Sequence, residues 1–133
     1  KIYSRTAGRP GHYISSGAKV DNSMITEGCV VEGEVANSIL FAGSQVKKGA
    51  IIESSILMPG AVVEEGAHIA YSIIAENVHV KKGACVGARP ESVEDKEKWG
   101  VAVVGENVTI GENAVVGPRA MLEKDVQDGE KLW

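Results

Sequence analysis

Apolar residues recur with a fixed period in the middle of the chain. Residues 37–53, 54–70 and 71–87 form three lines of seventeen in which the same residue types occupy the same columns. Within each line the large aliphatic residues follow one another at steps of 6, 6 and 5, beginning with Leu40, Val46 and Ile52. An amphipathic helix requires apolar residues three or four positions apart over several turns, and this stretch lacks that spacing. A fixed period of this length indicates a stacked array of repeats.

Nearly every large aliphatic residue is preceded, two positions earlier, by a small residue such as Ser38, Ser44 or Ala50. Because residues i and i+2 of an extended chain face the same side, each pair places one small and one large side chain inward. Polar turns, often containing glycine, separate the pairs, and glycine provides the backbone conformations that turns require. Three short strands per seventeen residues therefore predict one triangular coil of an all-β parallel β-helix, whose core is buried by stacking on the next coil.

The repeat extends beyond the regular coils in both directions. We expect residues 1–13 to form a linker and residues 14–133 to form one β-helix domain of about six triangular coils. A shortened step at Glu32-Gly33-Glu34 predicts one irregular corner.

Two segments of the domain lack the repeat. Residues 88–100 are charged, which predicts an excursion loop, with a short helix starting near Pro90 and with Trp99 against an apolar patch. The tail 125–133 is expected to cap the open end of the coil, with Leu132 and Trp133 as a lid, because an uncovered last coil is an unpaired strand edge.

The composition of the chain argues against several classes of function. The chain of 133 residues has 14 basic and 18 acidic residues and no basic stripe, so nucleic acid is not an expected partner. No run approaches the ~20 apolar residues of a membrane span, and no secretory signal is present. The two cysteines lack metal or redox spacing; we expect Cys29 to be buried, Cys85 to point outward, and the protein to be reduced and cytoplasmic. Because the chain starts with Lys1 rather than Met, we expect it to be a piece of a longer protein.

Candidate chemistry is sparse. The pairs Lys47-Lys48, Glu64-Glu65 and Lys81-Lys82 share one column of the repeat, which predicts a plus–minus–plus ladder that sets register rather than a phosphate site. His68 and His79 fall on outward positions, but a general base needs an orienting partner and a substrate channel, so we expect solvated histidines. A glycine-rich phosphate loop and Mg²⁺-binding carboxylates are missing, so we expect neither catalytic residues nor a metal site.

Several motifs resemble a known family. They are Asn22-Ser23, Glu27-Gly28-Cys29-Val30-Val31, Gly33-Glu34-Val35, Asn37-Ser38-Ile39-Leu40-Phe41 and Met58-Pro59-Gly60. Together they resemble the C-terminal domain of bacterial glucose-1-phosphate adenylyltransferase. The opening Ile2-Tyr3-Ser4-Arg5 and His12-Tyr13-Ile14 resemble the segment that joins the catalytic domain of that enzyme to its β-helix. The repeat is also similar to the left-handed β-helix of sugar nucleotidyltransferases and hexapeptide acyltransferases, and the left hand is expected from that resemblance alone.

The resemblance implies a regulatory and oligomerisation domain that does no chemistry alone and holds no cofactor. The parent enzyme would make ADP-glucose and pyrophosphate from ATP and glucose 1-phosphate, with Mg²⁺, for glycogen synthesis. Its implied partners are its own N-terminal catalytic domain, further subunits in a homo- or hetero-oligomer (a tetramer in the family), and a sugar-phosphate or nucleotide effector. For an anionic effector the candidate residues are Arg5, Arg9, Arg89, Lys96 and Lys98.

Three alternatives remain open from the sequence. The chain could be the β-helix of the non-catalytic partner subunit of the same enzyme. It could be a free-standing hexapeptide acyltransferase, which would depend on His68 or His79. It could also be a scaffold that assembles without any ligand.

Overall fold

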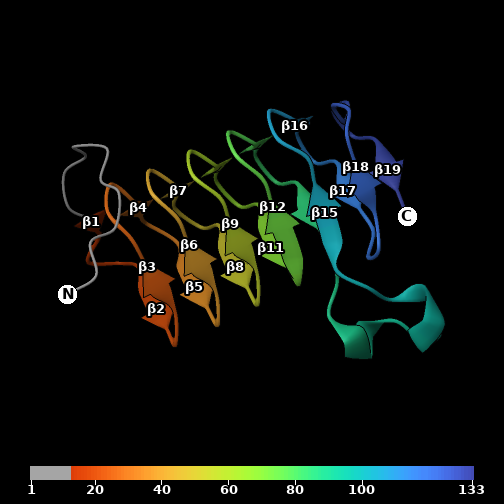
Figure 1. Cartoon of the computed structure of the whole chain (residues 1–133), viewed down its shortest axis with the longest axis horizontal. Helices are drawn as coiled ribbons and strands as arrows, with labels where there is room; N and C mark the ends of the chain where they lie inside the picture. The colour runs from red at the N-terminus through yellow and green to blue at the C-terminus, as the bar shows by residue number, and fades with distance from the viewer. Residues whose placement is uncertain (1–12) are drawn as a thin grey trace, which may run out of the picture.

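The computed structural model describes residues 13–133, which wind into a solenoid of three parallel β-sheets stacked along one axis (Figure 1). The sheets contain six, seven and six strands, and every strand pair is parallel. Each strand from β1 to β15 pairs with the strand three places later in the chain, and at the C-terminal end β17 pairs with β19. The predicted triangular coil, with three strands per turn, is confirmed.

Each sheet contains one strand from each of the successive coils. Sheet A contains β1 (Tyr13–Ile14), β4 (Val30–Val31), β7 (Gln45–Val46), β10 (Val62–Val63), β13 (His79–Val80) and β16 (Thr109–Ile110). Sheet B contains β2 (Lys19–Asp21), β5 (Glu34–Ala36), β8 (Ile51–Glu53), β11 (His68–Ala70), β14 (Cys85–Val86), β17 (Val115–Val116) and β19 (Lys131–Leu132). Sheet C contains β3 (Met24–Ile25), β6 (Ile39–Leu40), β9 (Ile56–Leu57), β12 (Ser72–Ile74), β15 (Ala102–Val104) and β18 (Met121–Leu122).

The interior is filled by the aliphatic positions of the repeat. The largest fully buried side chains are Leu40, Ile52, Leu57, Ile69, Ile74 and Ile110. Their small partners, including Ala50, Ala61, Ala67 and Ala84, are also fully buried. Cys29 is buried and Cys85 is exposed, as predicted. The period-2 alternation of the strands and the constant coil length together place these residues inside.

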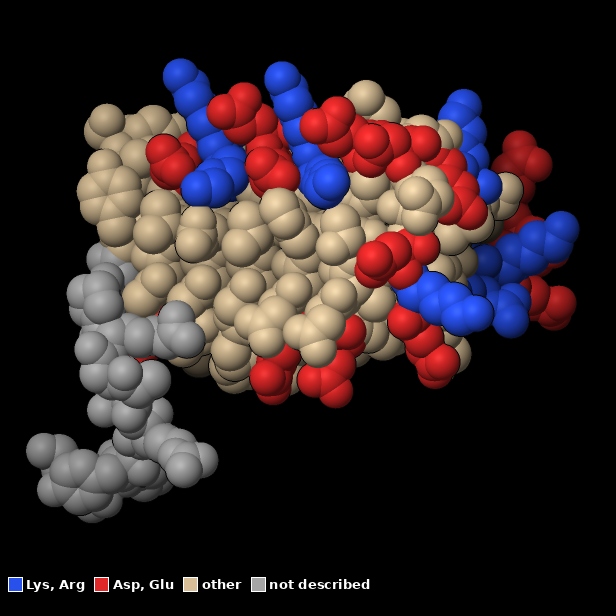
Figure 2. Space-filling model, turned by 90° about the horizontal axis from the view of Figure 1, so that it is seen from above, with Lys and Arg blue, Asp and Glu red and all other residues tan. Residues whose placement is uncertain are grey.

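The lysine and glutamate pairs stack at the corner between sheets A and B. Val46, Val63 and Val80 are register partners, so the residues that follow them lie in successive coils. Figure 2 shows basic and acidic side chains alternating along one long edge of the molecule, as the ladder predicts. Within residues 13–133, however, the ion pairs do not join these lysines to these glutamates, and Glu64 pairs instead with His79. The ladder is therefore an arrangement of exposed charges rather than a set of direct salt bridges.

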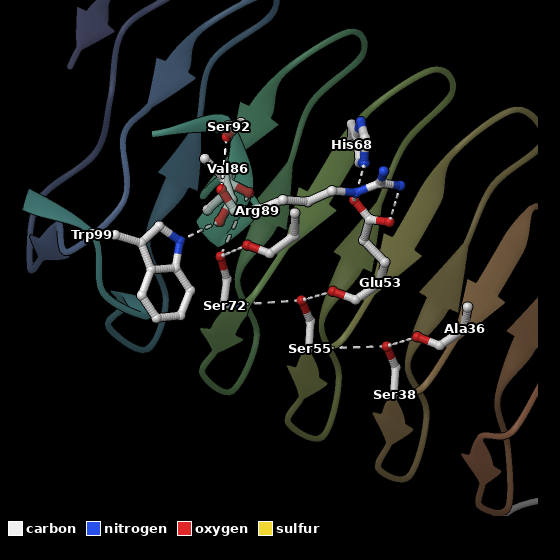
Figure 3. A network of polar contacts seen from close by, with 12 residues as sticks. Ala36, Ser38, Glu53, Ser55, His68, Ser72, Val86, Arg89, Ser92 and Trp99 are labelled. Carbon is white, nitrogen blue, oxygen red and sulfur yellow. Dashed lines mark hydrogen bonds and ion pairs between the residues drawn. The ribbon is translucent and has the colours of Figure 1, made fainter. Parts of the chain in front are cut away.

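A ladder of serine hydroxyls runs along the corner between sheets B and C (Figure 3). The backbone N–H groups of Ser55 and Ser72 donate to Ser38 Oγ and Ser55 Oγ, each at 3.1 Å. Each hydroxyl of Ser38, Ser55 and Ser72 donates in turn to the carbonyl two residues earlier, at 2.8 Å. The small inward residues of the repeat thus also satisfy buried backbone groups and fix the register of neighbouring coils.

The shortened step at residues 32–34 brings the backbone close to the next coil. Gly33 lies against the next coil, where a Cβ atom would collide with the backbone carbonyl oxygens of Ala50 and Lys47. Only glycine allows the backbone to approach this closely.

The tail covers the strand edge of the coil before it. Its residues 125–133 continue the solenoid: Val126 bridges Ile110 and is buried, and β19 pairs with β17. Leu132 and Trp133 are part of this added turn and are 37% and 71% exposed, and their role as a lid stays a prediction. The added turn also means that the predicted count of about six coils is slightly low.

Candidate functional site

The outward residues of sheet C form an apolar column along the whole solenoid. Consecutive register partners on this face are Met24, Ile39, Ile56, Ile73, Val103 and Met121. Met24 and Met121 at the two ends are 61% and 80% exposed, and the four residues between them are partly exposed. We name these six residues the sheet C column. Five spacings of about 4.8 Å give it a length of about 24 Å.

The other two faces are mixed in character. The outward column of sheet A includes Gln45, His79 and Thr109. The outward column of sheet B includes Lys19, Glu34 and His68. A continuous apolar face on a parallel sheet is normally covered, because such sheets are typically buried on both faces. The sheet C column is therefore the candidate interaction surface of the domain.

The excursion loop interrupts the corner between sheets B and C, between β14 and β15 (Figure 1). In earlier coils a single residue in the left-handed conformation makes this corner: Asn37, Ser54 and Tyr71, at φ 50°, 47° and 48°. The loop contains two short 3₁₀ turns, η1 (Pro90–Ser92) and η2 (Lys96–Lys98). The expectation of a short helix starting at Pro90 is confirmed.

Trp99 fastens the base of this loop (Figure 3). Its indole Nε1–H donates to the Ala88 carbonyl at 2.6 Å, across the two ends of the loop. Its ring meets Tyr71 edge to face, with centroids 5.6 Å apart. Arg119 Nη1 also donates to the Glu97 carbonyl at 2.5 Å. The loop is thus an ordered appendage, and the predicted packing of Trp99 is confirmed.

A polar cluster of Glu53, His68 and Arg89 lies beside the root of the loop (Figure 3). Arg89 Nε and Nη2 donate to the two oxygens of Glu53 at 2.8 and 2.6 Å, and His68 Nε2 lies 3.0 Å from Glu53 Oε1. Glu53 is flanked in register by Ala36 and Ala70, whose small side chains leave room for the cluster. The side chain of Glu53 is 15% exposed, whereas that of Arg89 is 55% exposed.

The electrostatics of the cluster favour an ionised Glu53. Hydrogen bonds from Arg89 hold the pKa of the Glu53 carboxyl below its usual value, against the opposing effect of partial burial. His68 lowers the pKa of Glu53 further, by a smaller amount. The carboxylate is therefore charged at neutral pH and is held by two donor side chains.

The cluster forms one wall of a groove on sheet B with a volume of about 350 Å³. The groove is also lined by Ile51 and Ala36 and by the Lys19–Glu34 ion pair at 3.6 Å. Its size is at the lower end of the range found for small-molecule sites.

The structure brings together only part of the predicted effector set. Arg5 and Arg9 lie outside the described residues. Arg89 is bound to Glu53, and Lys96 Nζ donates to the Pro90 carbonyl at 2.7 Å. Lys98 is exposed in the last turn of η2. Three of the five candidates thus belong to the excursion loop, and their role in effector binding stays a prediction.

The two outward histidines have carboxylate partners that the sequence analysis missed. His68 lies against Glu53, and His79 Nε2 lies against Glu64 Oε2. Each partner comes fifteen positions earlier, which places the two side chains in adjacent coils of a seventeen-residue repeat. This offset of fifteen residues is the sequence signal from which the two pairs could have been predicted. The expectation of fully solvated histidines without an orienting partner is wrong.

Within residues 13–133 the structure has no cluster of three or more His, Cys, Asp or Glu side chains that could hold a metal ion. Over the same residues, no helix has the length and apolarity needed to cross a membrane.

The solenoid, with its inward pairs of small and large residues, defines a hexapeptide-repeat β-helix protein. The chain belongs to the GlmU-like, C-terminal hexapeptide family, whose model matches residues 11–105. Two solved structures share the fold: a mutant perosamine N-acetyltransferase from Caulobacter crescentus in complex with CoA and GDP-perosamine, and the acetyltransferase domain of PglB from Neisseria gonorrhoeae in complex with acetyl coenzyme A. The first has a TM-score of 0.61 and 22% identity and covers 92% of this chain and 50% of its own. The second has a TM-score of 0.61 and 20% identity and covers 94% and 55%. The predicted left-handed parallel β-helix is confirmed.

Curated relatives are glucose-1-phosphate adenylyltransferases. The enzyme of Clostridium beijerinckii is 52% identical over 52 residues, or 39% of this chain and 14% of the relative. That of Clostridium botulinum strain Eklund 17B is 55% identical over 53 residues, or 40% and 14%. That of Geobacillus stearothermophilus is 47% identical over 53 residues, again 40% and 14%. The match falls in the C-terminal, non-catalytic region of longer enzymes that carry an N-terminal domain, which confirms the resemblance found in the sequence.

Proposed function

We propose that this chain is the regulatory and oligomerisation domain of a glucose-1-phosphate adenylyltransferase. The longer enzyme would convert ATP and glucose 1-phosphate to ADP-glucose and pyrophosphate in the cytoplasm, with Mg²⁺ held by its N-terminal part. Identity of about half over the matched C-terminal region supports this proposal. The domain itself would position neighbouring parts of the enzyme rather than contribute catalytic groups.

The sheet C column is the structural observation that carries the proposal. An exposed, uncharged and continuous apolar face indicates an interaction site. Its proposed occupant is the N-terminal part of the same enzyme, since the relatives extend far beyond the matched region. Its length of about 24 Å corresponds to roughly sixteen residues of α-helix, or about four turns. Further subunits and a sugar-phosphate or nucleotide effector would complete the assembly.

The longer chain that contains this sequence provides the test. An antibody against the domain should detect, in the source cells, a band well above the 14.0 kDa of this chain. The purified longer protein should form ADP-glucose. The Ile56→Asp substitution should weaken the contact between the domain and the rest of the enzyme, so that limited proteolysis cleaves between the two more quickly. Val62→Asp is the matched control, because Val62 is a partly exposed outward residue of the same coil on sheet A.

Three results would contradict the proposal. A native band of 14.0 kDa would exclude a longer enzyme. Absence of ADP-glucose formation would exclude the catalytic parent and leave the non-catalytic partner subunit as the alternative. Equal effects of the Ile56 and Val62 variants would exclude sheet C as the docking face.

Acyl transfer is the second candidate, because His79 is paired with Glu64 on the outer face of sheet A. A histidine oriented by a carboxylate is a suitable general base. This candidate predicts acyl-CoA-dependent activity of the chain itself that is lost on His79→Ala. A chain with no such activity would remove it.

A further inference from the structure

Charges of alternating sign follow one another along the corner between sheets A and B. They come directly after β4, β7, β10 and β13, whose register aligns them in successive coils. Figure 2 shows them along one long edge of the molecule. We name these positions the charge ladder and number its coils one to four: Glu32; Lys47 and Lys48; Glu64 and Glu65; Lys81 and Lys82.

The charges of the ladder are mostly unpaired within the chain. Among residues 13–133, no ion pair joins a lysine of the ladder to a carboxylate, although coils of opposite charge are neighbours. Lys48, Glu65 and Lys82 are exposed and line one open groove of about 510 Å³. The ladder can therefore pair with a partner whose charges alternate with the same spacing of about 4.8 Å.

A second copy of this chain carries such a pattern, and the signs of the charges select how it can pair. Two copies that run in the same direction, coil facing coil, place like charges opposite one another. An antiparallel copy centred on coil three also does so, because coil two then faces coil four. When the two-fold axis lies midway between coils two and three, coil two faces coil three and coil one faces coil four. Every facing set is then opposite in sign.

The residues beyond the ladder favour the same register. The coil after the ladder carries Glu112 at this corner, and the coil before it carries Ser15 and Ser16. With the axis between coils two and three, Glu112 faces the two neutral serines. With the axis between coils three and four, Glu32 would instead face Asp128 of the added turn, which is a pair of like charges. Only the first register combines the full ladder with no like-charge contact.

We propose that the charge ladder is a self-association surface through which two copies of this chain pair antiparallel, with the two-fold axis between coils two and three. Such a contact is isologous, so each charge is used twice. The four coils span only about 14 Å along a narrow corner, less than a stable interface needs, so the dimer is weak and salt-dependent. The contact goes beyond the function proposed above, because it requires neither the N-terminal part of the enzyme nor sheet C.

A charge swap tests the proposal. Sedimentation equilibrium of the 133-residue chain should show a dimer in about 0.01 M salt that dissociates in about 1 M salt, where the screening length falls from about 30 to about 3 Å. Lys48→Glu and Glu65→Lys should each weaken the dimer by at least about tenfold, since each replaces two attractions by two repulsions. An equimolar mixture of the two variants should restore it, because the reversed charges then face each other.

Lys124→Glu and Glu123→Lys are the matched controls. They change the net charge equally at exposed positions between β18 and Val126, on the corner between sheets C and A. Both variants should dimerise like the unmodified chain. Glu112→Lys tests the register: it should not weaken the dimer, whereas the register with the axis between coils three and four would place this residue opposite coil two and predicts a loss.

Three results would overturn the proposal: a chain that stays monomeric in low salt at about 1 mM, a mixture that associates no more tightly than either variant, or equal losses for Lys48→Glu and Lys124→Glu. Circular dichroism checks folding. If a variant of Lys48 or Glu65 does not fold, Lys82→Glu and Glu32→Lys give the same swap at coils four and one. A monomeric chain would leave the docking experiments on the longer enzyme unaffected, because those depend on sheet C.

Discussion

Ser55 and Ser38 are joined across adjacent coils by a hydrogen bond of 3.1 Å from the Ser55 backbone N–H to the Ser38 hydroxyl. Ser55 then repeats the arrangement by accepting from the Ser72 N–H, also at 3.1 Å. All three side chains are buried. The coils are thus linked at this corner by side chains as well as by the backbone bonds of the sheets.

Replacing Ser55→Ala should destabilise the fold by about 1–3 kcal/mol, because the buried Ser72 N–H loses its acceptor. The free energy of unfolding in urea measures the effect. Ser92→Ala is the control: Ser92 is exposed, and its hydroxyl bonds within the loop, so the change should stay within about 0.5 kcal/mol. Equal losses in the two variants would show that the ladder does not contribute to stability.

Truncation of two neighbouring residues of β9 should cost very different amounts of stability. Leu57 is fully buried, so Leu57→Ala should cost about 2–5 kcal/mol through lost burial and a cavity. Ile56, the next residue, faces outward in the sheet C column, and Ile56→Ala should cost less than about 1 kcal/mol in the chain alone. A large loss at Ile56 in unfolding experiments would mean that this face is structurally required without a partner.

Trp99→Phe should loosen the excursion loop. The change keeps an aromatic ring next to Tyr71 but removes the donor to the Ala88 carbonyl. We expect faster hydrogen exchange in residues 88–100 and a loss of global stability of no more than about 1.5 kcal/mol. Trp133→Phe, at an exposed position of the tail, is the control and should leave the loop amides unchanged. Unaltered exchange in the Trp99 variant would show that the loop is held by other contacts.

The ion pair between Arg89 and Glu53 should weaken at acidic pH. The pKa of Glu53 is lower in the folded chain than in the unfolded chain, so its contribution to stability is complete above the unfolded value of about 4.3 and is lost as pH falls through the folded pKa. Trp99 fluorescence in a Trp133→Phe background should report this change, since Trp99 and Arg89 belong to one loop. Glu53→Gln should remove the transition, and a transition that survives this substitution would assign it to another group.

Much of the fold could be predicted from residues 37–87 because each inward position is set by local alternation and a constant coil length. The outward surface was harder to predict. The sequence analysis identified His68 and His79 but not their partners, since Glu53 and Glu64 approach them only when coils stack. The same limit applied to Ser38, Ser55 and Ser72, which the repeat showed as small inward residues but not as a hydrogen-bonded ladder.

The sequence by itself determined the solenoid, its interior and the place of the excursion loop, because the repeat depends on residue spacing along the chain. Only the tertiary structure showed that Arg89, which follows β14, reaches back to Glu53 at the end of β8. It also showed that the tail adds a turn through β19, although its residues lack the repeat. These contacts depend on which side chains of different coils meet and on the hydrogen bonds available at an open sheet edge, and neither is encoded in a local pattern.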